Sequence, residues 1–297
     1  MQPLVSIIIT AYNHEDYVGA CLESMINQTY RNIELIVLND GSKDRTHEVI
    51  TAYEPKLAER FSKYTYIDKH NEGISVNFNK GIRMSSGDYI KTFASDDILL
   101  PQAIEHLVRF LEENSEFDVA YGDGYHILTK ETDLTDFEFD EIQRFSNITE
   151  LKSGYIYEHL LTMLPHMSTC TVLFRRKCFE EAGYYDESLS CEDMDLYLRY
   201  SREYQFGYIQ QDIALHRIHG DNAGYNPAIM IPSLQKMLAK YDRIHFFRSL
   251  EERDQFIEIL EWSQRVLEVI DYESRIPGKK GHRLGHRRLL SKIQGPG

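Results

Sequence analysis

Two aspartates stand side by side in the segment FASDDILLP, which spans residues 93–101. Asp96 and Asp97 follow an apolar run and precede Pro101, at which we expect a helix to begin. Carboxylate oxygens are the ligands that hard cations such as Mg²⁺ and Mn²⁺ prefer, so the pair could hold a metal. Aspartate also caps helix N-termini, and that function stays open here. Because neighbouring residues on a strand point to opposite faces, we expect different roles for the two, with Asp96 on the metal.

Polar residues also follow three other apolar segments that have the pattern of buried strands, 4–12, 33–40 and 64–70. Tyr12 could pack against a flat base, and Asp40 could accept hydrogen bonds from a base N–H or from ribose hydroxyls. The chain has neither GxGxxG after its first strand nor GxxxxGK[ST], so a dinucleotide fold and a P-loop are not indicated. A nucleotide diphosphate bound here would need positive charge, which a metal on the Asp pair could supply.

The elements that must position these residues alternate between strand and helix patterns. Further strands are expected at 87–95 and 117–128, with helices between the strands, including one that starts near Asn13 and one from Ile74 to Met84. Repeated β–α units of roughly 30 residues predict an α/β fold with an open, mostly parallel sheet flanked by helices. Ligands of such sheets bind beyond the carboxyl ends of the strands, so the polar strand ends should meet at one edge. Strands at 168–176 and 206–219 and a helix at 192–204 are expected to follow.

Charge and composition exclude several classes of protein. The 297 residues carry a formal net charge of −14, which argues against nucleic-acid binding. No apolar run approaches the roughly 18 residues of a membrane-spanning helix, and four cysteines without CxxC spacing fit a reducing cytoplasm. Residues 275–292 contain seven Lys or Arg and no acid. They are either a solvated tail or a peripheral contact with the inner face of the plasma membrane, and both alternatives stay open.

Six segments resemble a known family. SIIITAYN, ELIVLNDGSKDRT, NEGIS…NKGI, SGDYIKTFASDDILLP, EDMDL and HRIHGDN occur in this order over about residues 3–225, as in the family 2 inverting glycosyltransferases of the GT-A fold. The resemblance implies a glycosyltransferase domain at 1–225, with a nucleotide-binding half (1–128) and an acceptor half (129–225). Residues 226–297 would form a helical extension with a basic tail, through which the chain could also form a homo-oligomer.

The resemblance also implies roles for individual residues. A nucleotide-diphospho-sugar would contact Thr10, Tyr12, Asn13, Asp40, Asn71, Gly73, Asn79, Ser95 and Asp97. The metal, Mn²⁺ or Mg²⁺, would be held by Asp96, Asp97 and His219. Two positions depart from the family pattern. Ala94 stands where many members have an earlier Asp, and Phe78 stands where many have an Arg.

Inverting transfer needs a general base that lies across the sugar from the leaving group and therefore comes from a distant part of the chain. Glu192 and Asp193 fit this requirement. We expect Asp193 to be the base and Glu192 to bind the acceptor or to position Asp193. The alternative is that both merely interact favourably with the N-terminal dipole of the helix that follows.

The expected function is metal-dependent, inverting hexosyl transfer from a UDP-sugar to a sugar acceptor. The resemblance and the basic tail suggest a lipid-linked acceptor and a step in surface polysaccharide or O-antigen (lipopolysaccharide) synthesis. Two other functions remain open, a nucleotidyltransferase and a catalytically degenerate nucleotide-sugar-binding protein. The segment TAYNHEDY argues against the first, because it lacks a Gly-rich loop with Arg or Lys.

Overall fold

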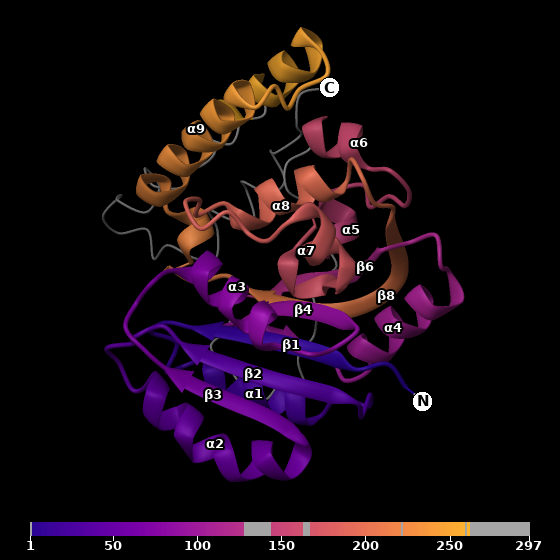
Figure 1. Ribbon diagram of the computed structural model, residues 1–297. Coiled ribbons are helices and arrows are strands. Elements are labelled where there is room, and N and C mark those ends of the chain that lie inside the picture. The colour runs from indigo at the N-terminus through magenta and orange to yellow at the C-terminus, as the bar shows by residue number, and fades with distance from the viewer. Residues whose placement is uncertain (1, 128–143, 163–166, 221, 259, 262–297) are drawn as a thin grey trace.

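A mixed sheet of eight strands forms the centre of the described part of the chain, in the order β3-β2-β1-β4-β7-β6-β8-β5. The computed structural model describes residues 2–127, 144–162, 167–220, 222–258 and 260–261 (Figure 1). The basic segment 275–292 lies outside these residues. Four strands from the first third of the chain are parallel to one another: β1 (Val5–Ala11), β2 (Ile33–Asn39), β3 (Lys63–Asp68) and β4 (Tyr89–Ala94).

The second half of the sheet is built differently. The strands are β5 (Ile98–Leu99), β6 (Val119–Ile127), β7 (Val172–Arg175) and β8 (Phe206–Arg217). β7 runs antiparallel between β4 and β6, whereas β6 and β8 are parallel. The predicted α/β fold with a mostly parallel sheet and flanking helices is therefore confirmed, with β7 and the short β5 as antiparallel strands.

Helices cover both faces of the sheet, as Figure 1 shows. One face carries α1 (Val18–Ile26), α2 (Thr46–Arg60) and α4 (Ala103–Glu113). The opposite face carries α3 (Ile74–Met84), α6 (Tyr157–Thr162), α7 (Lys177–Ala182), α8 (Glu192–Tyr200) and α9 (Pro227–Arg243). Strand β1 shows why two cores form, because its side chains alternate. Ile7 and Ile9 pack on the first face and Ile8 packs on the second.

Two helices begin later than the sequence predicts. Helix α1 begins at Val18 rather than near Asn13, because Asn13 has a positive φ of 54° and belongs to the turn after β1. Helix α4 begins at Ala103, because Ile98 and Leu99 first pair with β8. The residue that precedes α4 is Gln102, so neither Asp96 nor Asp97 caps this helix. The capping interpretation of the Asp pair is therefore wrong.

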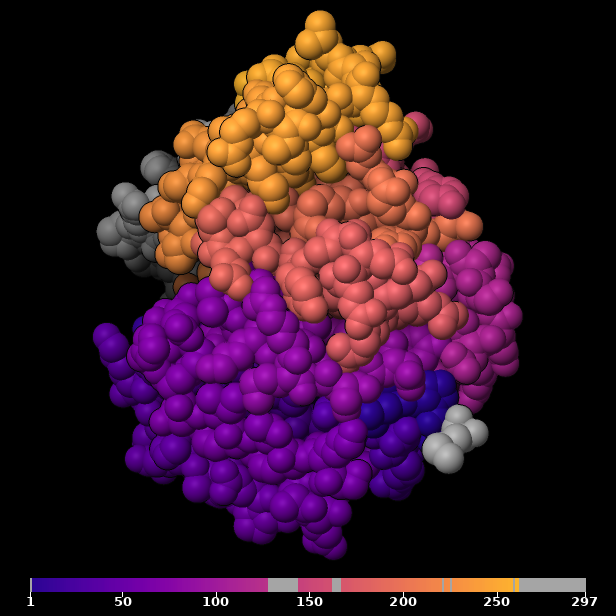
Figure 2. Space-filling view, viewed as in Figure 1, coloured from indigo at the N-terminus to yellow at the C-terminus, as the bar shows by residue number. Residues whose placement is uncertain are grey.

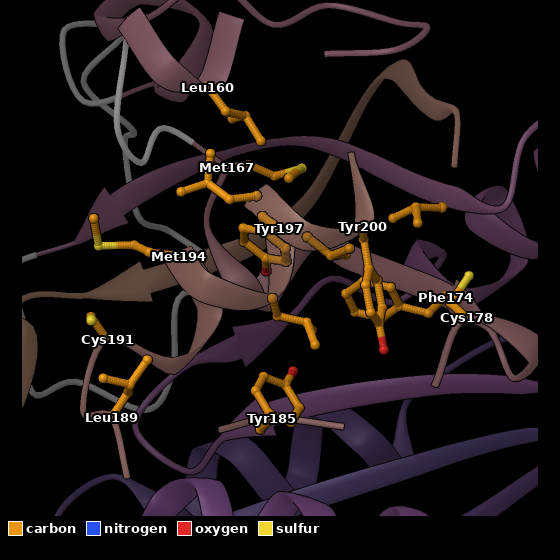
Figure 3. Close-up of a cluster of buried hydrophobic side chains, with 14 of the residues drawn as sticks. Leu160, Met167, Phe174, Cys178, Tyr185, Leu189, Cys191, Met194, Tyr197 and Tyr200 are labelled. Carbon is orange, nitrogen blue, oxygen red and sulfur yellow. The ribbon is translucent and has the colours of Figure 1, made fainter. Parts of the chain in front are cut away.

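Helix α8 is fixed in an aromatic core (Figure 3). The Phe174 ring centroid lies 6.2 Å from that of Tyr197 and 5.9 Å from that of Tyr200. Met194, in the first turn of α8, borders the same cluster. Because these side chains fill one face of α8, its N-terminal turn has a defined position relative to the sheet.

Helix α9 packs on α8 rather than on the first three strands, as Figures 1 and 2 show. Apolar side chains of α9, including Leu234 and Met237, belong to the same core as Cys191 and Met194. The packing also contains charge. Lys240 donates to the fully buried carboxylate of Asp195 at 2.6 Å. Among the described residues, no helix is both long and apolar enough to cross a membrane.

Candidate functional site

A cavity of about 670 Å³ lies beyond the carboxyl ends of β1, β2 and β4. Strand register explains its position, because Thr10 pairs with Leu38 on one side and with Ala94 on the other. The three strands therefore end at one level, and the polar residues that follow them meet there. The predicted site residues that line the cavity are Thr10, Tyr12, Asp40, Asn71, Gly73, Asp96, Asp97, Glu192 and Asp193.

Asp40 anchors the loop that follows β3. Its Oδ1 accepts hydrogen bonds from Lys69 Nζ and from the Glu72 backbone N–H, both at 2.8 Å, and its Oδ2 accepts from Gly73 N–H at 2.9 Å. Burial alone would raise the pKa of Asp40, but these hydrogen bonds outweigh it and lower the pKa. The carboxylate is thus charged at neutral pH and holds Asn71 and Gly73 at the cavity wall.

Asp96 is the most strongly acidic group of the cavity. Its Oδ2 lies 3.0 Å from His219 Nε2 and accepts a hydrogen bond from Asn222 Nδ2 at 3.1 Å. Burial would raise the pKa of Asp96, but the hydrogen bond with His219 and the neighbouring imidazoles lower it to about 2. Its Oδ1 is buried and accepts no hydrogen bond from the described residues. A buried oxygen of this kind fits a metal ion, because a cation would supply its missing partner.

His14 joins this group, although the sequence analysis did not single it out. Its Nε2 lies 3.9 Å from Asp96 Oδ2, and its Nδ1 lies 2.8 Å from Ser95 Oγ. Ligand atoms of His14, Asp96 and His219 all lie within 4.8 Å of one another. The signal that could have found His14 is its place two residues beyond Tyr12, at the same strand end. Ser95 and His219 do not line the cavity directly but contact residues that do.

Asp97 turns away from this cluster. Its Oδ1 accepts a hydrogen bond from the Arg217 backbone N–H at 2.9 Å, and Arg217 Nε donates to the carbonyl of Asp96 at 3.0 Å. Burial and the negative charge of Asp96 raise the pKa of Asp97 well above its usual value. The pair lies in a turn rather than on a strand, yet its two side chains diverge as expected. Asp97 is not among the clustered residues that could hold a metal in the described chain.

Glu192 and Asp193 reach the cavity from the N-terminal turn of α8. Thr169 Oγ1 donates to Asp193 Oδ2 at 3.0 Å, and the Met194 backbone N–H donates to Oδ1 at 2.8 Å. Burial raises the pKa of Glu192 to about 8, and the neighbouring carboxylate of Asp193 adds to this. Burial also raises the pKa of Asp193, against the hydrogen bond from Thr169. The hydrogen bond from Met194 shows that Asp193 also interacts with the start of the helix.

Besides Ser95, two of the predicted nucleotide-sugar residues, Asn79 and Asn13, do not line the cavity. Asn79 donates to the carbonyl of Tyr185 and to Glu187 Oε1, both at 2.9 Å, and accepts from Tyr185 N–H at 3.0 Å. Its amide therefore holds the segment before α8 instead of facing a ligand. The side-chain oxygen of Asn13 accepts from the Lys43 backbone N–H at 2.8 Å. Tyr12, by contrast, is 40% exposed, so its ring is available to stack on a ligand.

Apolar side chains form another part of the cavity wall. They are Phe145, Ile148, Met167, Met194, Ile229, Met230 and Leu234, and the last three belong to α9. The polar strand ends and this apolar wall therefore offer two different environments in one cavity.

The fold and the arrangement of strand-end polar groups define a glycosyltransferase of GT-A architecture. The chain matches glycosyl transferase family 2 over residues 6–183, and it belongs to that family. It is 33% identical over 218 residues to an uncharacterized glycosyltransferase of Rickettsia typhi, an alignment that covers 73% of this chain and 64% of the relative. A 27% identical relative, an uncharacterized glycosyltransferase of Methanocaldococcus jannaschii, aligns over 73% of this chain and 71% of its own length. The chain thus spans under two thirds of the Rickettsia relative.

Solved structures share the fold at low sequence identity. The mannosyltransferase PcManGT of Pyrobaculum calidifontis, solved with GDP-Man and Mn²⁺, superposes with a TM-score of 0.63 at 12% identity and covers 98% of this chain and 79% of its own. TarS 1–349 of S. aureus, solved with UDP-GlcNAc, gives 0.58 at 16% identity and covers 92% and 87%. These likenesses confirm the predicted GT-A fold.

Proposed function

We propose that the protein is a metal-dependent, inverting hexosyltransferase that moves a sugar from a nucleotide-diphospho-sugar to a sugar acceptor. One observation carries the proposal. The cluster of His14, Asp96 and His219 and the carboxylate pair Glu192–Asp193 come from distant parts of the chain and meet at one cavity. The structural neighbours were solved with UDP-GlcNAc and with GDP-Man plus Mn²⁺, which supports a nucleotide-sugar donor and a divalent cation here.

The proposed reaction is a single displacement at the anomeric carbon. The acceptor hydroxyl oxygen forms the new glycosidic bond while the bond to the nucleoside diphosphate breaks, and Asp193 takes the hydroxyl proton. Mn²⁺ or Mg²⁺ held by Asp96 and His219 would neutralise the charge that develops on the departing diphosphate. Attack opposite the leaving group converts an α-linked donor into a β-linked product.

The residues around Asp193 suit a base. Thr169 fixes one carboxylate oxygen at 3.0 Å, and the raised pKa makes the group a better proton acceptor than an exposed aspartate. Glu192, with a pKa of about 8, is largely protonated at pH 7 and can donate a hydrogen bond to an acceptor oxygen. A neutral Glu192 beside the hydrogen-bonded Asp193 supports the proposal that Asp193 is the base and that Glu192 binds the acceptor.

We further propose a UDP-sugar donor, a lipid-linked acceptor and a role in surface polysaccharide or O-antigen synthesis. The apolar cavity wall supports an acceptor with an apolar portion. The basic segment 275–292, with seven Lys or Arg, supports peripheral contact with an anionic membrane surface.

A panel of UDP- and GDP-sugars incubated with the protein and Mn²⁺ tests the proposal. We expect slow release of nucleoside diphosphate from one donor, faster when a suitable acceptor is present. Release of sugar 1-phosphate instead, with transfer of the nucleoside monophosphate, would indicate a nucleotidyltransferase, and donor binding without turnover would indicate a degenerate binding protein. Asp193→Asn should lower transfer by about 10²–10⁴-fold with donor affinity retained, whereas the exposed control Glu180→Gln should have no effect. Transfer that survives in Asp193→Asn would refute the base assignment.

A further inference from the structure

We propose that His14 is a third protein ligand of the cation, and that the resulting site of two imidazoles and one carboxylate selects transition metals over Mg²⁺. The proposal deepens the proposed function, on which its biological use rests. The protein should also hold the cation without a bound nucleotide, because three side chains provide the ligands.

The geometry places both imidazoles on one carboxylate. His219 Nε2 lies 3.0 Å and His14 Nε2 lies 3.9 Å from the same oxygen, Asp96 Oδ2. Adjacent ligands of an octahedral cation with bonds of about 2.1 Å lie about 3.0 Å apart, and opposite ligands about 4.2 Å apart. Both distances fall within this range. All three ligand atoms also lie within 4.8 Å of one another, so one ion can reach all three after small side-chain adjustments.

The surroundings of His14 orient its ring for this role. Ser95 is fully buried, and its Oγ lies 2.8 Å from His14 Nδ1. A protonated Nδ1 that donates to Ser95 leaves the Nε2 lone pair directed at Asp96, which is how metal-binding histidines are commonly held. On the other side, the Tyr17 ring stacks on His219 at 4.6 Å between centroids and fixes that imidazole as well.

Asp96 supplies a second, independent indication of a ligand. Its Oδ1 is buried and accepts no hydrogen bond within the described part of the chain, while Oδ2 already has His219 and Asn222 as partners. Leaving a buried carboxylate oxygen without a partner is costly. A cation bound by both oxygens of this carboxylate would supply the missing partner of Oδ1 and would lie beside Oδ2, the oxygen to which both imidazoles are close.

The donor set determines the preference among metals. Imidazole nitrogen suits Zn²⁺, Ni²⁺ and other transition metals, whereas Mg²⁺ favours carboxylate, phosphate and water oxygens and loses its water reluctantly. A site built from Asp96 alone would depend on the diphosphate for further ligands. With His14 and His219, two imidazole nitrogens of the protein take the place of diphosphate oxygens as ligands. Mn²⁺, Co²⁺ and Zn²⁺ should therefore bind the nucleotide-free protein more tightly than Mg²⁺ does.

Calorimetric titration of the full chain with MnCl₂, CoCl₂ and MgCl₂ in the absence of nucleotide tests the proposal, with electron paramagnetic resonance to count bound Mn²⁺. We expect one Mn²⁺ per chain and at least tenfold weaker Mg²⁺ binding. His14→Gln should weaken Mn²⁺ binding by about 10–100-fold. The matched control is His126→Gln, because His126 lines the same cavity but pairs with His216 at 2.9 Å outside the cluster. This control should keep the affinity within about twofold.

A second variant distinguishes loss of a ligand from loss of folding. His14→Asp replaces the nitrogen ligand by an oxygen ligand, so the variant should still bind a cation but should shift its preference towards Mg²⁺. Equal Mn²⁺ affinity in wild type and a folded His14→Gln variant would overturn the proposal, as would Mg²⁺ binding as tight as Mn²⁺ or an unchanged preference in His14→Asp. If Mn²⁺-dependent transfer occurs while His14→Gln binds Mn²⁺ normally, the inference fails and the proposed function stands. If the cation binds as described but no sugar is transferred, the inference stands and the proposed function fails.

Discussion

Replacing Glu192 by Gln should make the protein more stable, and the gain should grow with pH. Burial and the neighbouring Asp193 raise the pKa of Glu192 from its ordinary value of 4.5 to about 8 in the folded protein. Between these two pH values the folded protein binds a proton that the unfolded chain has lost, so the free energy of unfolding falls as pH rises. The stability that the protonated group provides is complete below about pH 4.5 and is lost by about pH 8. The amide side chain of the Glu192→Gln variant does not ionise, so the variant does not lose this stability as the pH rises.

The magnitude follows from the same pKa difference. Each pKa unit corresponds to about 1.4 kcal/mol, so the full difference would destabilise the wild-type protein by about 5 kcal/mol at high pH. Glu192 is partly exposed to the cavity, and water there reduces the penalty. We therefore expect Glu192→Gln to raise the free energy of unfolding by about 2–3 kcal/mol at pH 8.5 and by less than about 0.5 kcal/mol at pH 5.

Urea unfolding at pH 5, 7 and 8.5 measures this effect for wild type, Glu192→Gln and the exposed control Glu180→Gln. Equal slopes of the denaturation curves would show that the variants expose the same surface on unfolding. Identical pH dependence for wild type and Glu192→Gln would refute the reasoning, because it would mean that Glu192 ionises normally in the fold. A loss of transfer that accompanies the gain in stability would show that this carboxyl, although it destabilises the fold at high pH, is retained for function.

Other predictions concern the residues that support the site. Thr169→Val removes the hydrogen bond that lowers the pKa of Asp193, so the rising limb of the pH profile of transfer should move up by about one pH unit; an unmoved limb would argue against Asp193 as the base. Lys240→Met removes one donor from the buried carboxylate of Asp195 and should lower the free energy of unfolding by about 1–3 kcal/mol, measured in urea; no change would show that the pair contributes nothing. Burial lowers the pKa of Lys91 from 10.5 to about 7, so stability should rise with pH between these values; Lys91→Met should flatten that rise, and an unchanged slope in urea unfolding would contradict it.

Local pattern predicted the strand ends and the fold class well, because side-chain periodicity and the polar residues that follow each strand lie in short segments of the sequence. Helix Ile74–Met84, for example, has the bounds that the sequence predicts. Contacts between distant residues were harder to predict. His14 meets Ser95 across 81 positions, and nothing in the sequence around His14 indicates that partner. The insertion of β7 between β4 and β6 was missed for the same reason, since strand neighbours depend on pairing between distant residues.

The residue types of two asparagines, Asn13 after β1 and Asn79 in α3, misled the sequence analysis in a consistent way. Asn79 and Asn13 have the polarity of ligand-binding residues, but both side chains bond to the protein's own backbone. Asparagine is suited to both functions, because one amide both donates and accepts. Only the positions of the neighbouring backbone groups distinguish them, and these positions depend on the folded structure. The predicted division into halves at 1–128 and 129–225 stays a prediction.

The carboxylates in the first turn of α8 have two different surroundings. Glu192 and Asp193 face the cavity, while Asp195, two residues later, is held by Lys240 of α9. Helix α9 in turn contributes apolar side chains to the cavity wall. If the acceptor binds against this wall, as proposed above, exchange of these residues should alter acceptor choice without changing any carboxylate or imidazole of the site. Helix α9 is thus a natural target for a combinatorial library aimed at new acceptors, provided that the Lys240 anchor is kept.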